Sequence, residues 1–141
     1  MSDAATIVRE VEAFYRGYID SFNREDVDAY LHSFCYPNAR MRGAQAMTVH
    51  AQESDQLRYY QALMAALRQE GWGCSAIVGR LRVAPLTDST AILVADIIRY
   101  RKDNSAIENT RLCYIVGKDA GAWKFLTLTE VKPPFTGLCG T

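Results

Sequence analysis

One carboxyl group stands out because it interrupts an otherwise apolar stretch. Asp96 lies in the segment Ala91-Ile-Leu-Val-Ala-Asp-Ile-Ile98, and strand alternation places its side chain on one face with Ile92, Val94 and Ile98. A carboxylate among apolar neighbours must be paired with a cation or take up a proton. In the second case it can serve as a proton donor or general base, so we predict that Asp96 is catalytic. Pairing with an arginine is the structural alternative.

The next apolar segment carries polar residues on one side. Asn109, Arg111 and Cys113 alternate along it and share a strand face. A guanidinium group can hold a carboxylate through two parallel hydrogen bonds, which makes Arg111 a candidate substrate-binding residue together with Asn109. Alternatively, Arg111 pairs with Asp96 or lies at a subunit surface.

Two tyrosines lie on the apolar stripe of the first predicted helix, which spans Asp3 to Phe22. We predict a catalytic hydroxyl at Tyr18 and a substrate-contacting ring at Tyr15. The alternative is that both rings serve only as core residues, since aromatic side chains dominate the packed face of such a helix.

Two further helices are predicted from spacing and capping signals. The short one follows Asn23, which we expect to act as its N-cap, and it stops before Pro37. The segment 38–51 is expected to form a small hairpin or a crossing strand. Ser54 is expected to be the N-cap of the third helix, and the apolar stripe that includes Tyr60 and Met64 should contact a bound substrate.

After Gly73 the pattern changes to strands with short connections. We predict strands over 75–84, 90–101, 106–116 and 122–131. Such brief connections join antiparallel neighbours and leave no room for a parallel crossover, so the strands should form a meander. Phe135 and Leu138 in the glycine-rich tail are expected to cover a sheet edge.

This order of elements, with the segments Phe14-Tyr-Arg-Gly-Tyr-Ile-Asp-Ser-Phe-Asn-Arg-Glu-Asp-Val-Asp-Ala-Tyr-Leu31 and Gly121-Ala-Trp-Lys-Phe125, resembles the nuclear transport factor 2-like superfamily. The resemblance covers nearly the whole chain. It implies one α+β domain over residues 1–141, with three N-terminal helices packed in the concave face of a curved, mainly antiparallel sheet. It also implies a cone-shaped pocket, but it does not select a function, because the superfamily contains several enzymes and non-enzymatic modules.

Ketosteroid isomerases within this superfamily offer the sharpest comparison. The resemblance places Tyr18 on their helical tyrosine, Arg42 on their aspartate base and Cys113 on the protonated aspartic acid of their oxyanion hole. An arginine cannot abstract a proton near neutral pH, so that isomerase mechanism is not expected. Arg42 and Cys113 instead become candidate substrate-binding residues.

Composition and motif spacing limit the classes of molecule that this chain is expected to bind. The sixteen basic and sixteen acidic residues balance, which argues against nucleic acid and anionic membranes as partners. The four cysteines are widely spaced, and His32 and His50 are isolated, so we expect no metal site and no cofactor. No signal peptide or membrane span is predicted, which favours a cytoplasmic protein. Apolar residues on both faces of 91–98 predict a homodimer formed through the sheet.

The leading functional hypothesis is a protein with a pocket for a small, largely apolar molecule. It would be a cofactor-independent lyase, isomerase or hydrolase that uses acid-base chemistry. The alternatives are a non-catalytic carrier of a small ligand and a module for dimerisation or assembly. An unpaired Asp96 at the pocket floor favours an enzyme, a pocket with every polar group satisfied favours a carrier, and a filled pocket favours assembly.

Overall fold

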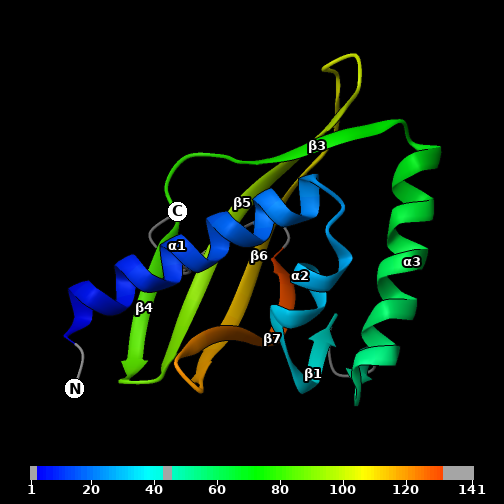
Figure 1. Ribbon diagram of the computed structural model, residues 1–141. Coiled ribbons are helices and arrows are strands. Elements are labelled where there is room, and N and C mark those ends of the chain that lie inside the picture. Colours follow the sequence, from blue (N-terminus) through cyan, green and yellow to red (C-terminus); the bar gives the residue numbers. More distant parts are fainter. Residues whose placement is uncertain (1–2, 43–45, 132–141) are drawn as a thin grey trace.

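The computed structural model describes residues 3–42 and 46–131, which form helices packed against one curved sheet (Figure 1). The helices are α1 (Ala4–Asn23), α2 (Val27–His32) and α3 (Glu53–Gln69). The strands are β1 (Phe34–Met41), β2 (Met47–His50), β3 (Trp72–Ile77), β4 (Arg82–Thr87), β5 (Thr90–Arg101), β6 (Ala106–Asp119) and β7 (Ala122–Val131). The predicted α+β class is confirmed. The tail expected to cover a sheet edge lies outside the described residues.

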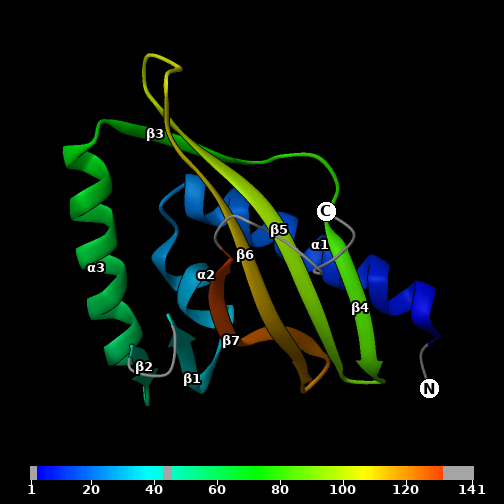
Figure 2. The same ribbon diagram turned by 180° about the vertical axis from the view of Figure 1, so that it is seen from behind.

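The sheet is mainly antiparallel, as predicted. Its order is β2-β1-β7-β6-β5-β3, and β4 also pairs with β5. The hairpin-linked strands β5, β6 and β7 form the expected meander, and β1 joins β7 in parallel after the helical segment. Seen from behind, the strands lie in front of α1, which shows that this helix covers a single face of the sheet (Figure 2).

The strand predicted over 75–84 is divided in two. β3 ends at Ile77 and β4 begins at Arg82, and both strands pair with β5 along different parts of its length. Gly79 turns the chain between them with a φ of +66°, a conformation that glycine adopts without strain. Because β5 is long, it bridges the two halves of this broken edge.

Two helix starts differ from the predictions. Asn23 is the last residue of α1, and its side chain forms hydrogen bonds with the backbone of Ser75. The N-cap of α2 is instead Asp26, whose carboxylate accepts from the amide of Ala29 at 3.1 Å. The third helix begins at Glu53 and has Gln52 as its N-cap, whereas Ser54 was the predicted cap. Several residues in this region can act as caps, so spacing alone did not select among them.

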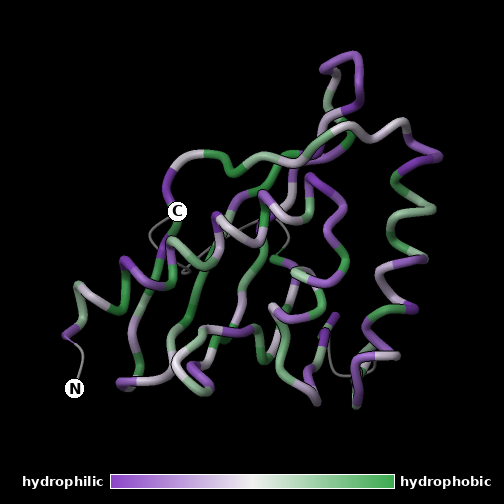
Figure 3. The backbone as a smooth tube through the Cα atoms, in the orientation of Figure 1, coloured by the Kyte–Doolittle hydropathy of each residue, from purple (hydrophilic) through white to green (hydrophobic). Residues whose placement is uncertain are grey.

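The core lies between α1 and the middle strands of the sheet. Ile7, Val11, Tyr15, Ile19 and Phe22 form the buried stripe of α1. Every second residue of β5 faces this stripe. These residues are Ala91, Leu93, Ala95 and Ile97, all at most 2% exposed. The hydropathy trace shows hydrophobic stretches along β5 and a hydrophilic tip at the β5–β6 turn (Figure 3).

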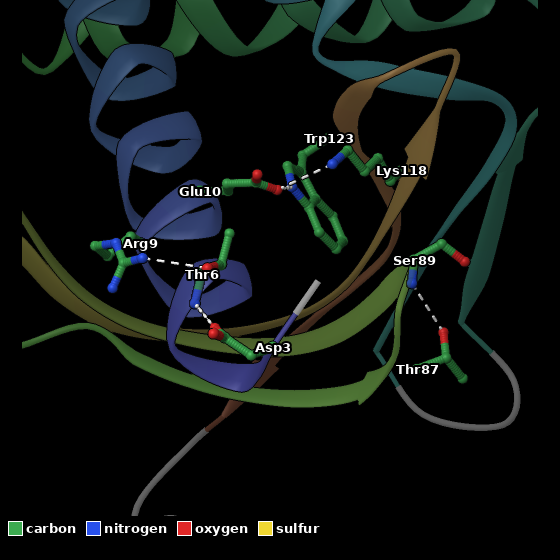
Figure 4. Close-up of polar contacts among 8 residues, drawn as sticks. All are labelled: Asp3, Thr6, Arg9, Glu10, Thr87, Ser89, Lys118 and Trp123. Atoms are coloured by element: carbon green, nitrogen blue, oxygen red, sulfur yellow. Dashed lines mark hydrogen bonds and ion pairs between the residues drawn. The ribbon is translucent and has the colours of Figure 1, made fainter. Parts of the chain in front are cut away.

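Polar contacts hold α1 at its N-terminal end (Figure 4). Asp3 caps the helix by accepting from the amide of Thr6 at 2.8 Å. The carboxylate of Glu10 accepts from the indole of Trp123 at 2.9 Å and from the ammonium of Lys118 at 3.1 Å. These two hydrogen bonds, that of Trp123 first, lower the pKa of Glu10. The helix is thereby fastened across the β6–β7 hairpin.

Candidate functional site

A cavity of about 690 Å³ opens between the helices and the sheet. This volume lies in the range of pockets that hold small organic molecules. Residues from all three helices and from strands β1, β5, β6 and β7 contribute to its wall. On the helix side of the sheet the lining residues are Tyr18, Phe22, Tyr30, Arg40, Tyr59, Leu63, Arg99, Glu108, Thr110, Leu112, Tyr114, Leu128 and Glu130.

Tyr18 is the central aromatic residue of this wall. Its ring packs edge-on against Phe125 at 4.7 Å and stacks on Tyr30 at 6.0 Å between ring centroids. Its hydroxyl makes no hydrogen bond with the described residues. Burial raises the pKa of Tyr18 to about 12, against the opposing influence of the nearby cations Arg40 and Arg99. The hydroxyl therefore keeps its proton near neutral pH and is able to donate a hydrogen bond.

Three arginines reach the cavity from the helix side or its mouth, and they differ in their partners. Arg99 lies 3.0 Å from a carboxylate oxygen of Glu108, and Arg42 lies 3.2 Å from one of Glu130. Arg40 has no ion pair among the described residues. Its guanidinium stacks on the ring of Tyr59, 4.4 Å from the centroid.

Arg40 also carries a polar atom without a partner. Its Nε is buried and makes no hydrogen bond with the described residues; the same is true of the Nε of Arg99, but that side chain has Glu108 as an ion-pair partner. A buried donor that lacks an acceptor destabilises the protein, so such a group at a cavity wall is a strong candidate for contact with a ligand. Because the other two arginines are balanced by carboxylates, the helix side of the cavity has an uncompensated positive charge at Arg40.

Asp96 forms the structural pair that was the alternative to a catalytic role. Arg111 donates hydrogen bonds to both carboxylate oxygens of Asp96, from Nε at 2.6 Å and from Nη2 at 3.1 Å. A guanidinium nitrogen of Arg82 lies 3.7 Å from one of these oxygens. Asp96 lies opposite Arg111 in the β5–β6 ladder, so adjacent strands present the two groups side by side. This bidentate contact leaves the carboxylate held between two cations.

Asp96 and Tyr18 belong to opposite faces of the sheet. The neighbours of Asp96, Ala95 and Ile97, point into the helix-side core, so Asp96 points to the far face. Both residues are nevertheless among those that line the 690 Å³ cavity. They reach it from different sides, which does not fit the expectation of one joint catalytic pair.

Asn109, Arg111 and Cys113 share this far face, whereas the family resemblance implied that Cys113, and with it this strand face, is directed toward the pocket. The residues between them, Leu112 and Tyr114, face the core instead, and Tyr114 bonds Tyr15 at 3.0 Å between hydroxyl oxygens. Asn109 and Arg111 still line the far-side part of the cavity, whereas Cys113 is not among its lining residues. A shift of one residue reverses the face of every side chain in a strand.

Tyr15, Tyr60 and Met64 are core residues and do not line this cavity. They are 0%, 7% and 1% exposed and belong to the main hydrophobic cluster. The preceding residues of α3, Tyr59 and Leu63, turn toward the cavity in place of Tyr60 and Met64. A rotation of about 100° per residue around the helix accounts for this difference.

Arg40, Arg99 and Tyr59 were missed by the sequence analysis. Arg99 lies on the same face of β5 as Ala91, Ala95 and Ile97, which point toward the helices. Strand alternation would therefore have identified Arg99 once the inner face of β5 was known. Arg40 on β1 has the same parity as Arg42, which lies one residue beyond the end of this strand, and this supplied a weak signal. Neither signal specifies that both guanidinium groups meet the aromatic wall of the cavity.

Comparison with known proteins now places this fold. The model of a family described as NTF2-like protein (DUF6841) matches residues 9–133. The chain belongs to this NTF2-like family. No curated protein matches it significantly.

Solved structures show the same fold at low sequence identity. An NTF2-like protein of unknown function from Pseudomonas putida has a TM-score of 0.73 at 11% identity, covering 94% of this chain and 90% of that one. One from Shewanella oneidensis has a TM-score of 0.69 at 13% identity, covering 89% and 98%. A ketosteroid isomerase-like protein from Erwinia carotovora atroseptica has a TM-score of 0.61 at 16% identity, covering 89% and 96%.

Other features of this NTF2-like chain bear on partners. Within residues 3–42 and 46–131, no three histidine, cysteine, aspartate or glutamate residues gather in a way that would hold a metal ion. No helix in these ranges is long and apolar enough to cross a membrane. The homodimer expected from the sequence stays a prediction, which light scattering at tens of micromolar tests.

Replacing Asp96 with asparagine is expected to destabilise this NTF2-like protein by about 1–2 kcal/mol. The change removes the carboxylate that Arg111, 8% exposed, and Arg82 both contact. The loss should lie between that of a surface pair and a fully buried one. Urea unfolding measures it, with the exposed Asp88→Asn as control. An unchanged midpoint for the Asp96 variant would contradict a structural role and restore the catalytic hypothesis.

Proposed function

We propose that this NTF2-like domain binds a small, largely apolar organic acid in the helix-side cavity. The anionic group lies against Arg40 and the hydroxyl of Tyr18, and the apolar body packs on the aromatic wall. The observation that carries this proposal is the buried Nε of Arg40, which has no hydrogen bond and no ion pair among the described residues. A ligand carboxylate supplies both the missing acceptor and the missing negative charge.

The chemistry of the wall supports a ligand with a planar apolar body. Tyr18, Tyr30 and Phe22 present ring faces and edges to the cavity, and Leu63 and Leu128 add aliphatic surface. Aromatic rings favour offset or edge-on contacts with other rings, and an Arg40 side chain stacked on Tyr59 is held in place for bidentate contact. The resulting site is apolar with a few directed polar groups, as ligand pockets commonly are.

Binding is a better supported role than acid-base catalysis. The carboxylates that line the cavity, Asp96, Glu108 and Glu130, each lie within ion-pair distance of an arginine. Each of these carboxylates is therefore already engaged by a guanidinium group, which leaves it less free to contact a proton of a substrate. Tyr18 keeps its proton, so it can stabilise a negatively charged oxygen but cannot remove a proton near neutral pH. These features favour the carrier alternative over the lyase, isomerase or hydrolase hypothesis.

A matched pair of ligands tests the proposal. We expect 2-naphthoate to bind at least about tenfold more tightly than the uncharged 2-naphthamide, since a charge-assisted hydrogen bond is worth roughly 1.5–3 kcal/mol. Isothermal titration calorimetry measures both affinities. Native mass spectrometry of freshly purified protein should show a co-purifying acid if one is retained. Equal affinities for the two naphthalene compounds would show an apolar pocket without anion preference and would overturn the proposal.

A further inference from the structure

A chain of buried polar groups leads from the backbone of β1 to the cavity. It begins at Asn38, which is 6% exposed and whose side-chain Nδ2 donates to the carbonyl oxygen of Cys35 at 2.8 Å. A backbone carbonyl only accepts hydrogen bonds, so the side-chain nitrogen of Asn38, not its oxygen, must face the carbonyl of Cys35. The orientation of the Asn38 side chain is thereby determined, and its Oδ1 is directed to His50.

The second link is His50, a buried residue of β2. Its Nδ1 lies 3.3 Å from Oδ1 of Asn38 and 2.7 Å from Oε1 of Gln56. The oxygen of Asn38 is an acceptor, so Nδ1 must carry a proton in order to avoid facing it with a lone pair. The cationic imidazole and the neutral Nδ1–H tautomer both meet this condition, whereas the neutral Nε2–H tautomer does not.

The third link is Gln56, which is 1% exposed. Since Nδ1 of His50 donates, the carbonyl oxygen of Gln56 must be the group that faces it. The amide nitrogen of Gln56 then points to the hydroxyl oxygen of Tyr30 at 2.8 Å, and this nitrogen can only donate. Tyr30 is the acceptor in that bond, so its own hydroxyl proton is directed elsewhere.

We propose that Tyr30 is a second hydrogen-bond donor to the bound anion, and that Asn38, His50 and Gln56 are positioning residues that aim its proton into the cavity. Tyr30 lines this cavity, and its ring stacks beside Tyr18. The two hydroxyl groups and the guanidinium of Arg40 then converge on one acidic group. This inference rests on the proposed function for the identity of the acceptor.

Burial supports the donor role. Desolvation raises the pKa of Tyr30, and the charge of a neighbouring Tyr18 would raise it further. Tyr30 therefore stays protonated, so the direction of its proton depends on Gln56 alone among the described residues. A reversed Gln56 would accept this proton and remove it from the cavity.

Ligand-free protein permits a direct test of the relay. The chain contains only two histidines, so a His32→Gln variant assigns the imidazole signals of His50 in a long-range proton–nitrogen correlation spectrum. We expect Nδ1 to give the signal of a protonated nitrogen at every pH at which the protein is folded. A bare Nδ1 at neutral pH would overturn the relay. This readout does not require any ligand, so it separates failure of the relay from failure of the proposed function.

Two variants then test the direction of the Tyr30 proton. Tyr30→Phe is expected to weaken 2-naphthoate binding by roughly tenfold and to change 2-naphthamide binding far less. Gln56→Met, which keeps the side-chain size and removes the amide, is expected to weaken 2-naphthoate binding, because the Tyr30 hydroxyl is then no longer oriented by a donor. If Tyr30 instead donates to Gln56, the first variant has no effect and the second binds more tightly. Thermal unfolding confirms that both variants are folded.

Discussion

The protein is expected to unfold in alkaline solution between pH 10 and 12. Four buried tyrosines, Tyr15, Tyr18, Tyr30 and Tyr114, have pKa values raised by burial, that of Tyr18 to about 12. In the unfolded chain a tyrosine loses its proton near pH 10. Above that pH the unfolded state therefore binds fewer protons than the folded state, and stability falls as the pH rises. Below pH 10 these tyrosines are protonated in both states, so they do not make the stability depend on pH.

The size of this effect follows from linkage. Each such group lowers the free energy of unfolding by about 1.4 kcal/mol per pH unit, so four groups remove roughly 5 kcal/mol by pH 11. This is comparable with the whole stability of many domains. Urea unfolding at several pH values measures the slope, and tyrosinate absorbance should rise together with unfolding.

Tyr18→Phe is the matched variant for this experiment. The Tyr18 hydroxyl makes no hydrogen bond with the described residues, so its removal should leave the fold intact at neutral pH while reducing the alkaline slope by about one group, roughly 1.4 kcal/mol per pH unit. A wild-type protein whose stability is level from pH 9 to pH 11.5 would show that these hydroxyl groups are not buried in the way described.

Arg40→Met is expected to weaken 2-naphthoate binding by roughly 30- to 100-fold, about 2–3 kcal/mol. The guanidinium is the group we assign to the ligand anion, and hydrogen bonds to charged groups have this magnitude. At the same time stability should be unchanged or higher. Methionine keeps an apolar stem against Tyr59 and removes a buried donor that has no acceptor.

The neighbouring Arg42 provides the control. Its side chain is 58% exposed and pairs with Glu130, so Arg42→Met should change the affinity several times less than the Arg40 variant. Similar losses in both variants would indicate a general electrostatic effect of the cavity mouth. That result would contradict a specific contact between Arg40 and the ligand anion.

The order and type of the elements were largely determined by the sequence itself. The long first helix, the third helix and strands β5, β6 and β7 follow from periodicity and from turn residues with defined conformations, and each is local in origin. The short connections between these strands excluded a parallel crossover, which is why the meander was predictable. The junction of β3 and β4 was not, because an isolated glycine in an apolar run does not indicate where pairing stops.

The inner face of β5 could be decided only by the tertiary structure. Residues Ala91 to Ala95 are apolar on both sides, so their pattern fits either orientation. Packing of α1 selected Ala91, Leu93, Ala95 and Ile97 for the core, and this choice sent Asp96 and Arg111 to the far face. The neighbouring strands follow the register of β5, so one choice reversed the predicted positions of Asn109 and Cys113 as well.

The candidate site depends on contacts that are distant in sequence. Tyr18 was identified because its helical stripe and the family resemblance agreed on it. Arg40 became a candidate only because β1 lies beside β7 and brings its guanidinium to Tyr59 of α3, where no carboxylate lies within ion-pair distance among the described residues. Sequence determined which groups can carry charge or donate protons, whereas long-range packing decided which of them are balanced and which remain available to a ligand.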